Sequence, residues 1–122
     1  MNIIPIIRCK DIDRSITFYT QVLDFTVMDM YQDEQVRLTF LTLGGLVVEL
    51  IQYMEPPKEE RGKGVVDHIA FTVENLETAL AKVKDAGAAF LFSEPKTVNG
   101  KRIFFFAGPD GERLEFCQVP AE

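Results

Sequence analysis

The chain carries one pattern twice, and this repeat limits what it can fold into. When the sequence is laid over itself with a shift of about 64 residues, residues 4–16 align with residues 68–80. Further along, residues 45–52 align with residues 111–118 at a shift of about 66. Self-similarity of this length indicates two copies of one supersecondary unit packed into one structure.

Each copy is expected to contain a strand, a helix and three further strands. In the first copy the expected strands are 2–9, 25–30, 36–43 and 46–53, with a helix that Asp11 or Asp13 caps after the first strand. In the second copy they are 66–73, 89–92, 102–107 and 113–119, with a helix that begins after Asn75 and ends at Gly87. The order βαβββ therefore occurs twice, and the fold class is α+β.

The length of the chain argues that the two copies form one domain. Two modules of about 55 residues would each be marginal alone, whereas 122 residues suit a single domain. Residues 55–64 contain two prolines and two glycines among polar residues and form the linker. We therefore expect one domain over 1–122, with a first module at 1–54 and a second at 65–122.

Strand alternation assigns the side chains of each module to two faces. Successive strand residues point to opposite faces, so one face is expected to line a cavity and the other to pack under a helix. The expected cavity side includes Arg8, Arg37, Thr39, Glu49, Tyr53, His68, Ile103, Phe105, Arg113 and Glu115. The expected helix side includes Leu38, Phe40, Phe104 and Phe106.

The repeat also places two carboxylates at matched positions, Glu49 and Glu115. His68 is the single histidine, and the matched position in the first copy is Ile4. A carboxylate within so apolar a strand must be paired, protonated or bound to a cation, because burying a bare charge is costly. A metal or acid/base site would explain the three side chains. The alternatives are salt bridges from the carboxylates to Arg8, Arg37 or Arg113, and a neutral core histidine hydrogen-bonded to a carboxylate.

Charge and hydropathy exclude several classes of function. A net charge of −6 without a basic patch argues against binding nucleic acid. No apolar run reaches the roughly 18 residues of a membrane span, and the first residues have no basic segment of the kind that opens a signal peptide. Cys9 and Cys117 do not match in the repeat and are expected to be reduced thiols of a cytoplasmic protein.

Three segments, residues 7–19, 67–73 and 106–116, together with the repeat, resemble the vicinal oxygen chelate superfamily. That group includes glyoxalase I, methylmalonyl-CoA epimerase, extradiol dioxygenases, and the bleomycin and fosfomycin resistance proteins. The resemblance covers nearly the whole chain. It implies paired βαβββ modules whose curved mixed sheets surround a cavity, the glyoxalase/bleomycin resistance fold.

The resemblance also implies a set of site residues. The glyoxalase I branch commonly holds a divalent metal with four side chains, and Glu49, His68 and Glu115 match three of them. Ile4 stands at the fourth position and cannot bind a metal, so Ni, Zn, Mn or Fe is expected to bind weakly or not at all. The same resemblance makes Arg8, Tyr53, Phe105 and Arg113 candidates for binding substrate, although Tyr53 stands where an asparagine that contacts glutathione is expected. One histidine cannot supply the two-histidine iron site of an extradiol dioxygenase.

Two functions follow. The first is a metal-assisted lyase or isomerase, in which the ion polarises a substrate carbonyl and Glu115 or Glu49 moves the proton. The second is a metal-free protein that binds a small molecule of the antibiotic type, as the bleomycin resistance proteins do. In either case a homodimer is expected, with pockets that combine Glu49 of one chain with His68 and Glu115 of the other.

Overall fold

The computed structural model describes residues 4–55, 66–98 and 100–119, so the expected linker lies almost wholly outside the described residues. The chain divides into two compact units, Met1–Arg61 and Gly62–Glu122. Each unit is one βαβββ module with a four-stranded mixed sheet, which confirms the expected α+β class. None of the described helices is long and apolar enough to cross a membrane.

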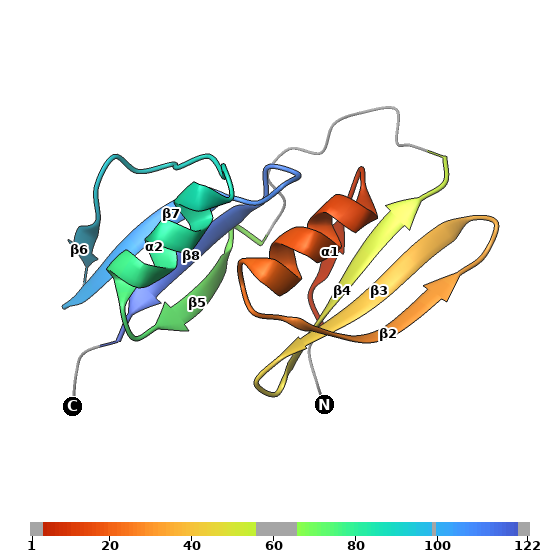
Figure 1. Ribbon diagram of the computed structural model, residues 1–122, viewed down its shortest axis with the longest axis horizontal. Coiled ribbons are helices and arrows are strands. Elements are labelled where there is room, and N and C mark those ends of the chain that lie inside the picture. Colours follow the sequence, from red (N-terminus) through yellow and green to blue (C-terminus); the bar gives the residue numbers. More distant parts are fainter. Residues whose placement is uncertain (1–3, 56–65, 99, 120–122) are drawn as a thin grey trace. The chain divides into compact units, whose positions relative to one another are not determined.

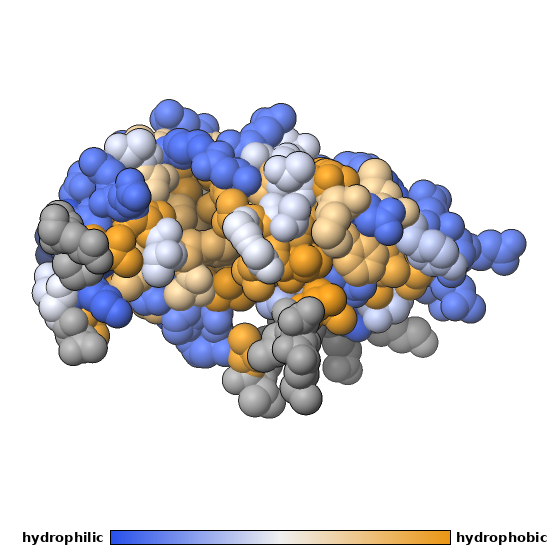
Figure 2. All heavy atoms as spheres, turned by 90° about the horizontal axis from the view of Figure 1, so that it is seen from below, coloured by the Kyte–Doolittle hydropathy of each residue, from blue (hydrophilic) through white to orange (hydrophobic). Residues whose placement is uncertain are grey.

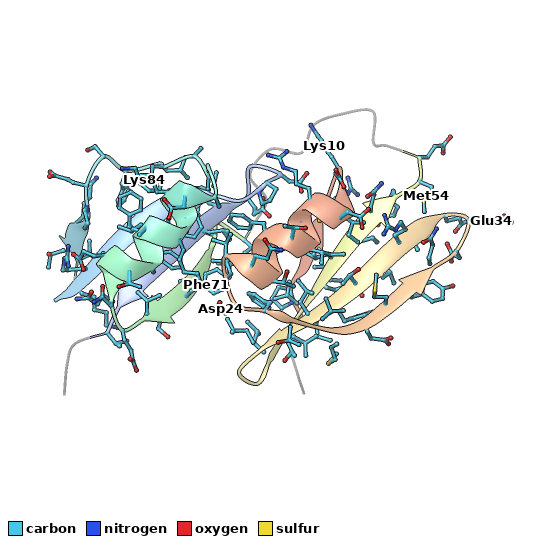
Figure 3. The ribbon with its side chains drawn as sticks, viewed as in Figure 1. Lys10, Asp24, Glu34, Met54, Phe71 and Lys84 are labelled. Carbon is cyan, nitrogen blue, oxygen red and sulfur yellow. The ribbon has the colours of Figure 1, made fainter. Side chains whose placement is uncertain are left out.

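The first unit has one helix lying on one face of its sheet (Figure 1). Its elements are β1 (Ile6–Arg8), α1 (Ile12–Gln21), β2 (Thr26–Gln32), β3 (Val36–Leu43) and β4 (Leu46–Tyr53). The strands lie in the order β1-β4-β3-β2, with β1 parallel to β4 and the other pairs antiparallel. Asp24, which has a φ of 63°, lies between α1 and β2, and Glu34 lies in the turn between β2 and β3 (Figure 3).

The second unit repeats this topology. Its elements are β5 (Ile69–Val73), α2 (Leu76–Asp85), β6 (Lys96–Val98), β7 (Lys101–Ala107) and β8 (Arg113–Gln118). The strands lie in the order β5-β8-β7-β6, again with one parallel pair, β5 and β8. The first strand of each unit therefore lies beside its last strand, which is the strand that carries the carboxylate.

The helix ends follow the predicted capping residues. The Asp11 side chain accepts a hydrogen bond from the Arg14 N–H at 3.3 Å, and the Asn75 side chain accepts one from the Thr78 N–H at 2.9 Å. Gly87 follows α2 with a φ of 77°, a conformation that glycine adopts without strain. The helices and the sheet faces beneath them enclose the core of each unit, which contains Ile12, Tyr19, Leu41, Val48 and Leu50 in the first and Leu76, Val83, Phe104, Phe106 and Leu114 in the second.

The prediction of a strand at 89–92 was wrong. In that stretch only Phe90 makes an isolated bridge, to Phe106, and the third ladder of the sheet is formed by β6. Val98 pairs with Lys101, so β6 directly neighbours β7 in the sheet. The sequence Asn-Gly favours a two-residue hairpin, and the first strand of such a hairpin ends directly before the asparagine.

The assignment of faces in β3 was also wrong. Glu49 lies opposite Phe40 and Glu115 lies opposite Phe105, so Phe40, rather than Thr39, is the equivalent of Phe105. Arg37 and Thr39 accordingly belong to the helix side of the sheet, and Leu38 and Phe40 to the carboxylate side. The cause is the length of chain between the paired positions: eight residues separate Phe40 from Glu49, whereas nine separate Phe105 from Glu115. A register difference of one residue moves every side chain of a strand to the other face.

Candidate functional site

His68 lies directly before β5, and both of its ring nitrogens face a carboxylate. Nδ1 is 2.7 Å from Oδ2 of Asp67, and Nε2 is 3.4 Å from Oε2 of Glu115. The His68 side chain is 28% exposed and that of Glu115 only 14% exposed. The second unit therefore brings together two of the three predicted metal ligands, with Nε2 of His68 facing Oε2 of Glu115.

Glu115 reaches this position because β8 is held between two strands. It pairs with Ala70 of β5 on one side and Phe105 of β7 on the other, and side chains opposite each other in neighbouring strands share a face. The Phe105 ring is buried and meets the His68 ring edge to face, with centroids 4.8 Å apart. One wall of the site is thus a fixed aromatic ring, which limits how far the imidazole can turn.

Arg113 lies two residues before Glu115 and binds Asp67 instead of Glu115. Its Nη1 atom is 3.2 Å from Oδ2 and 3.5 Å from Oδ1 of Asp67. The guanidinium carbon lies 4.8 Å from the centre of the Phe105 ring. The salt bridge between Arg113 and Glu115 that sequence left open is therefore not formed, and the guanidinium neutralises Asp67.

In the first unit, Glu49 lies on β4 between Ile6 of β1 and Phe40 of β3. It is half-buried, and within the described part of the chain its side chain has no hydrogen-bond or ion-pair partner. Ile4 stands two residues before Ile6, as His68 stands two residues before Ala70, so the structure confirms that Ile4 and His68 are equivalent. Ile4 is 46% exposed, and its side chain offers no donor atom.

The two other arginines that might have balanced Glu49 have different partners. Arg37 forms a two-point ion pair with Asp13 of α1, at 3.0 and 3.1 Å, and this lowers the pKa of Asp13. Arg8 is exposed and lies over the Tyr53 ring, 4.9 Å from its centre. Arg8 and Tyr53, both predicted to bind substrate, therefore lie together at one end of the sheet. Sequence placed Arg37 in the cavity because of the error in β3.

The donor set of the second unit fits part of a divalent metal site. Zn²⁺ and similar ions bind imidazole nitrogen and carboxylate oxygen, and His68 and Glu115 present one of each on a common face. No group of three such side chains able to hold an ion occurs among the residues with described positions. Glu49, the third predicted ligand, belongs to the other unit. A groove of about 200 Å³ beside β2 and β3 includes none of the predicted site residues.

Sequence reasoning did not find Asp67. Asp67 directly precedes the single histidine, and the expected strand at 66–73 would place these two neighbours on opposite faces. Residues 67 and 68 in fact precede β5, so strand alternation does not apply to them.

The other unexpected feature is exposed apolar surface: Figure 2 shows apolar side chains reaching the surface on the face that it presents. Exposed apolar residues of the first unit include Ile6, Met28, Met30, Tyr31 and Tyr53.

Comparison with known proteins assigns the chain to a family. The Glyoxalase/Bleomycin resistance protein/Dioxygenase superfamily matches residues 3–116. Uncharacterized protein YwbC of Bacillus subtilis is 35% identical over 118 residues, which is 92% of each protein. A probable lactoylglutathione lyase of Vibrio cholerae is 31% identical over 120 residues, which is 92% of this chain and 86% of that one.

Solved structures agree with this assignment. A glyoxylase/bleomycin resistance protein/dioxygenase domain from Frankia sp. EAN1pec superposes with a TM-score of 0.81 at 22% identity, covering 94% of both chains. Glyoxalase I from Zea mays gives 0.81 at 25% identity, covering 97% of this chain and 44% of that one. The paired βαβββ modules define a protein of the vicinal oxygen chelate type. The chain belongs to the Glyoxalase/Bleomycin resistance protein/Dioxygenase superfamily, whose members bind small molecules.

Proposed function

We propose that this protein is a divalent-metal-assisted lyase or isomerase that acts on a small carbonyl compound. The observation that carries the proposal is the pair formed by His68 and Glu115, with Nε2 and Oε2 at 3.4 Å on one sheet face. A carboxylate on Nδ1 of a histidine is also the usual outer partner of a metal-binding imidazole, and Asp67 has that place. Relatives named as lactoylglutathione lyases are consistent with this reaction class.

In this proposal His68, Glu115 and Glu49 would hold the ion. When bound, a divalent ion supplies Lewis-acid polarisation of the substrate carbonyl. The chain supplies the proton transfer: the carboxylate of Glu115 or Glu49 takes a proton from the carbon beside the carbonyl and returns it to a neighbouring atom.

The remaining predicted residues would position the substrate. Arg8 lies over the Tyr53 ring, so its guanidinium is held at the sheet end and is available to bind an anionic group of the substrate. Phe105 would form an apolar wall beside the reacting atoms, and Arg113 a second cationic contact. Tyr53 replaces the asparagine expected for glutathione, so we propose a carbonyl substrate other than a glutathione adduct.

The test is proton exchange by protein of known metal content. Purified protein without an affinity tag is loaded with Zn²⁺, Ni²⁺ or Mn²⁺ and incubated in D₂O with small α-hydroxy and α-keto carbonyl compounds. We expect exchange of the hydrogen beside the carbonyl in wild type. Exchange should fall at least 100-fold in Glu115→Gln, which loses the proposed acid/base group, and in His68→Ala, which loses a proposed metal ligand. Equal exchange by wild type and both variants would contradict the proposal.

A metal-free binding protein is the second candidate, and Ile4 is the observation that favours it. An isoleucine at the fourth ligand position leaves at most three protein ligands, and the net charge of −6 suits a cationic guest. Calorimetry of chelator-treated protein with cationic antibiotics, beginning with bleomycin, distinguishes the two. Binding that is unchanged by His68→Ala and by added Zn²⁺ would support the metal-free function.

A further inference from the structure

We propose that Asp67, itself held by Arg113, is a positioning residue that fixes the orientation and tautomer of His68 so that bare Nε2 faces Glu115. This inference rests on the proposed function insofar as it concerns metal binding, but the state of His68 is a property of the protein without metal. It assigns to Arg113 and Phe105 a task besides contact with substrate. Comparison of the two copies does not reveal this arrangement, because the first module has no equivalent of it.

The two distances determine which nitrogen carries the proton. A neutral imidazole has one N–H donor and one acceptor nitrogen, and an ionised carboxylate can only accept. The 2.7 Å separation from Asp67 is that of a strong charge-assisted hydrogen bond, whereas 3.4 Å to Glu115 is too long for one. Nδ1 of His68 therefore donates to Asp67, and Nε2 keeps its lone pair on the side of Glu115.

Arg113 contributes to holding Asp67 in this position. The Asp67 side chain is 56% exposed, so its hydrogen bond to His68 competes with water. The two contacts from Arg113 restrict that rotation, and the guanidinium is in turn placed by the buried Phe105 ring, 4.8 Å away. Phe105 also contacts the His68 ring. The four side chains thus form a closed arrangement in which each member limits the movement of the next.

Arg113 has a second effect, on charge. Without it, Asp67 and Glu115 would place two uncompensated negative charges around one imidazole. The guanidinium forms an ion pair with Asp67 at 3.2 Å and offsets that charge. The matched positions of the first module support the pairing of these roles, since Ile4 replaces His68 and Val47 replaces Arg113.

The single histidine makes the test direct. Nitrogen-15 NMR of untagged, metal-free protein, at a pH where the imidazole is neutral, reports which His68 nitrogen is protonated. We expect the Nδ1–H form in wild type and in Asp67→Asn, whose amide oxygen still accepts, but a shift toward Nε2–H in Asp67→Ala. The matched control is Asp85→Ala, at the exposed end of α2, which should behave as wild type. Thermal melts verify that each variant is folded.

Zn²⁺ titration by calorimetry gives the second readout. Affinity should fall about 10- to 100-fold in Asp67→Ala and be largely retained in Asp67→Asn. An Nε2–H form in wild type, an unchanged tautomer in Asp67→Ala, or an unchanged Zn²⁺ affinity in Asp67→Ala would each overturn the assignment. If wild type binds no Zn²⁺, the metal-assisted function fails instead, and the tautomers alone decide the role of Asp67.

Discussion

Gln52 Oε1 accepts a hydrogen bond of 2.7 Å from the backbone N–H of Ile12, the first residue of α1. The second unit has the same contact, from the Leu76 N–H to Gln118 Oε1 at 2.8 Å. The first N–H groups of a helix have no partner within the helix. In each unit the last strand therefore satisfies one of them, and it thereby fixes where the helix begins relative to the strand that carries the site carboxylate.

Replacing Gln52 by leucine should destabilise the protein by about 1–2 kcal/mol, because a part-buried N–H would lose its acceptor. Gln118→Leu should cost a similar amount. Urea denaturation followed by circular dichroism measures both. The control is Gln21→Leu, an exposed glutamine at the end of α1. If all three variants were equally stable, the two hydrogen bonds would contribute nothing measurable.

Ile4→His should raise the affinity for Ni²⁺ or Zn²⁺ about tenfold or more, since it restores a donor at the position equivalent to His68. Calorimetric titration of both proteins measures the gain. The role inferred for Asp67 adds a further expectation: the double variant Ile3→Asp, Ile4→His should bind the metal ion more tightly than Ile4→His alone. Tight metal binding by wild type, with no gain in Ile4→His, would show that position 4 is not the missing ligand.

Much of this architecture was predictable from the repeat because strands and helix caps depend on local residues. Asp11, Asn75 and Gly87 act where their chemistry places them, and the order βαβββ was correct. The errors arose where the exact number of residues between strands matters. The one extra residue between the paired positions of β7 and β8 made the faces assigned to β3 wrong. The third strand of the second module was expected at 89–92, but β6 lies at Lys96–Val98. Gln52 and Gln118 were missed because their contacts bridge separate segments, and hydropathy patterns carry no information about such pairs. Asp67 was missed because strand alternation was applied to residues that in fact precede β5.

The turn between β2 and β3 should make the first unit sensitive to acid. The backbone N–H groups of Gln35 and Val36 and the hydroxyl of Tyr31 all donate to the Asp33 carboxylate and lower its pKa. Because the folded pKa is the lower one, this stabilisation is complete above the ordinary aspartate pKa of about 4 and is lost as the pH falls below it. Asp33→Asn should therefore melt earlier than wild type at pH 7, by a margin that shrinks toward pH 2. Asp85→Asn is the control, and a margin independent of pH would contradict this account.

The protein should be a homodimer. Each sheet ends in open strands, and β2 is exposed along its whole length with Val27, Met28, Met30 and Tyr31 at the surface. Open edges and exposed apolar residues of this kind favour association with another chain. Light scattering at micromolar concentration should report about twice the chain mass of 13.8 kDa. A monomer at every accessible concentration would rule the dimer out.

If the pockets are built from both chains, two inactive variants should complement each other. Glu49→Ala and Glu115→Ala each remove one proposed ligand from every pocket of their own homodimer. In a mixed dimer, however, one pocket would receive Glu49 from the Glu115→Ala chain and Glu115 from the Glu49→Ala chain, and would be intact. Unfolding and refolding the two variants together should therefore restore metal binding to about half of the pockets in each mixed dimer. A dimer that shows no restoration would mean that each site takes all its ligands from one chain.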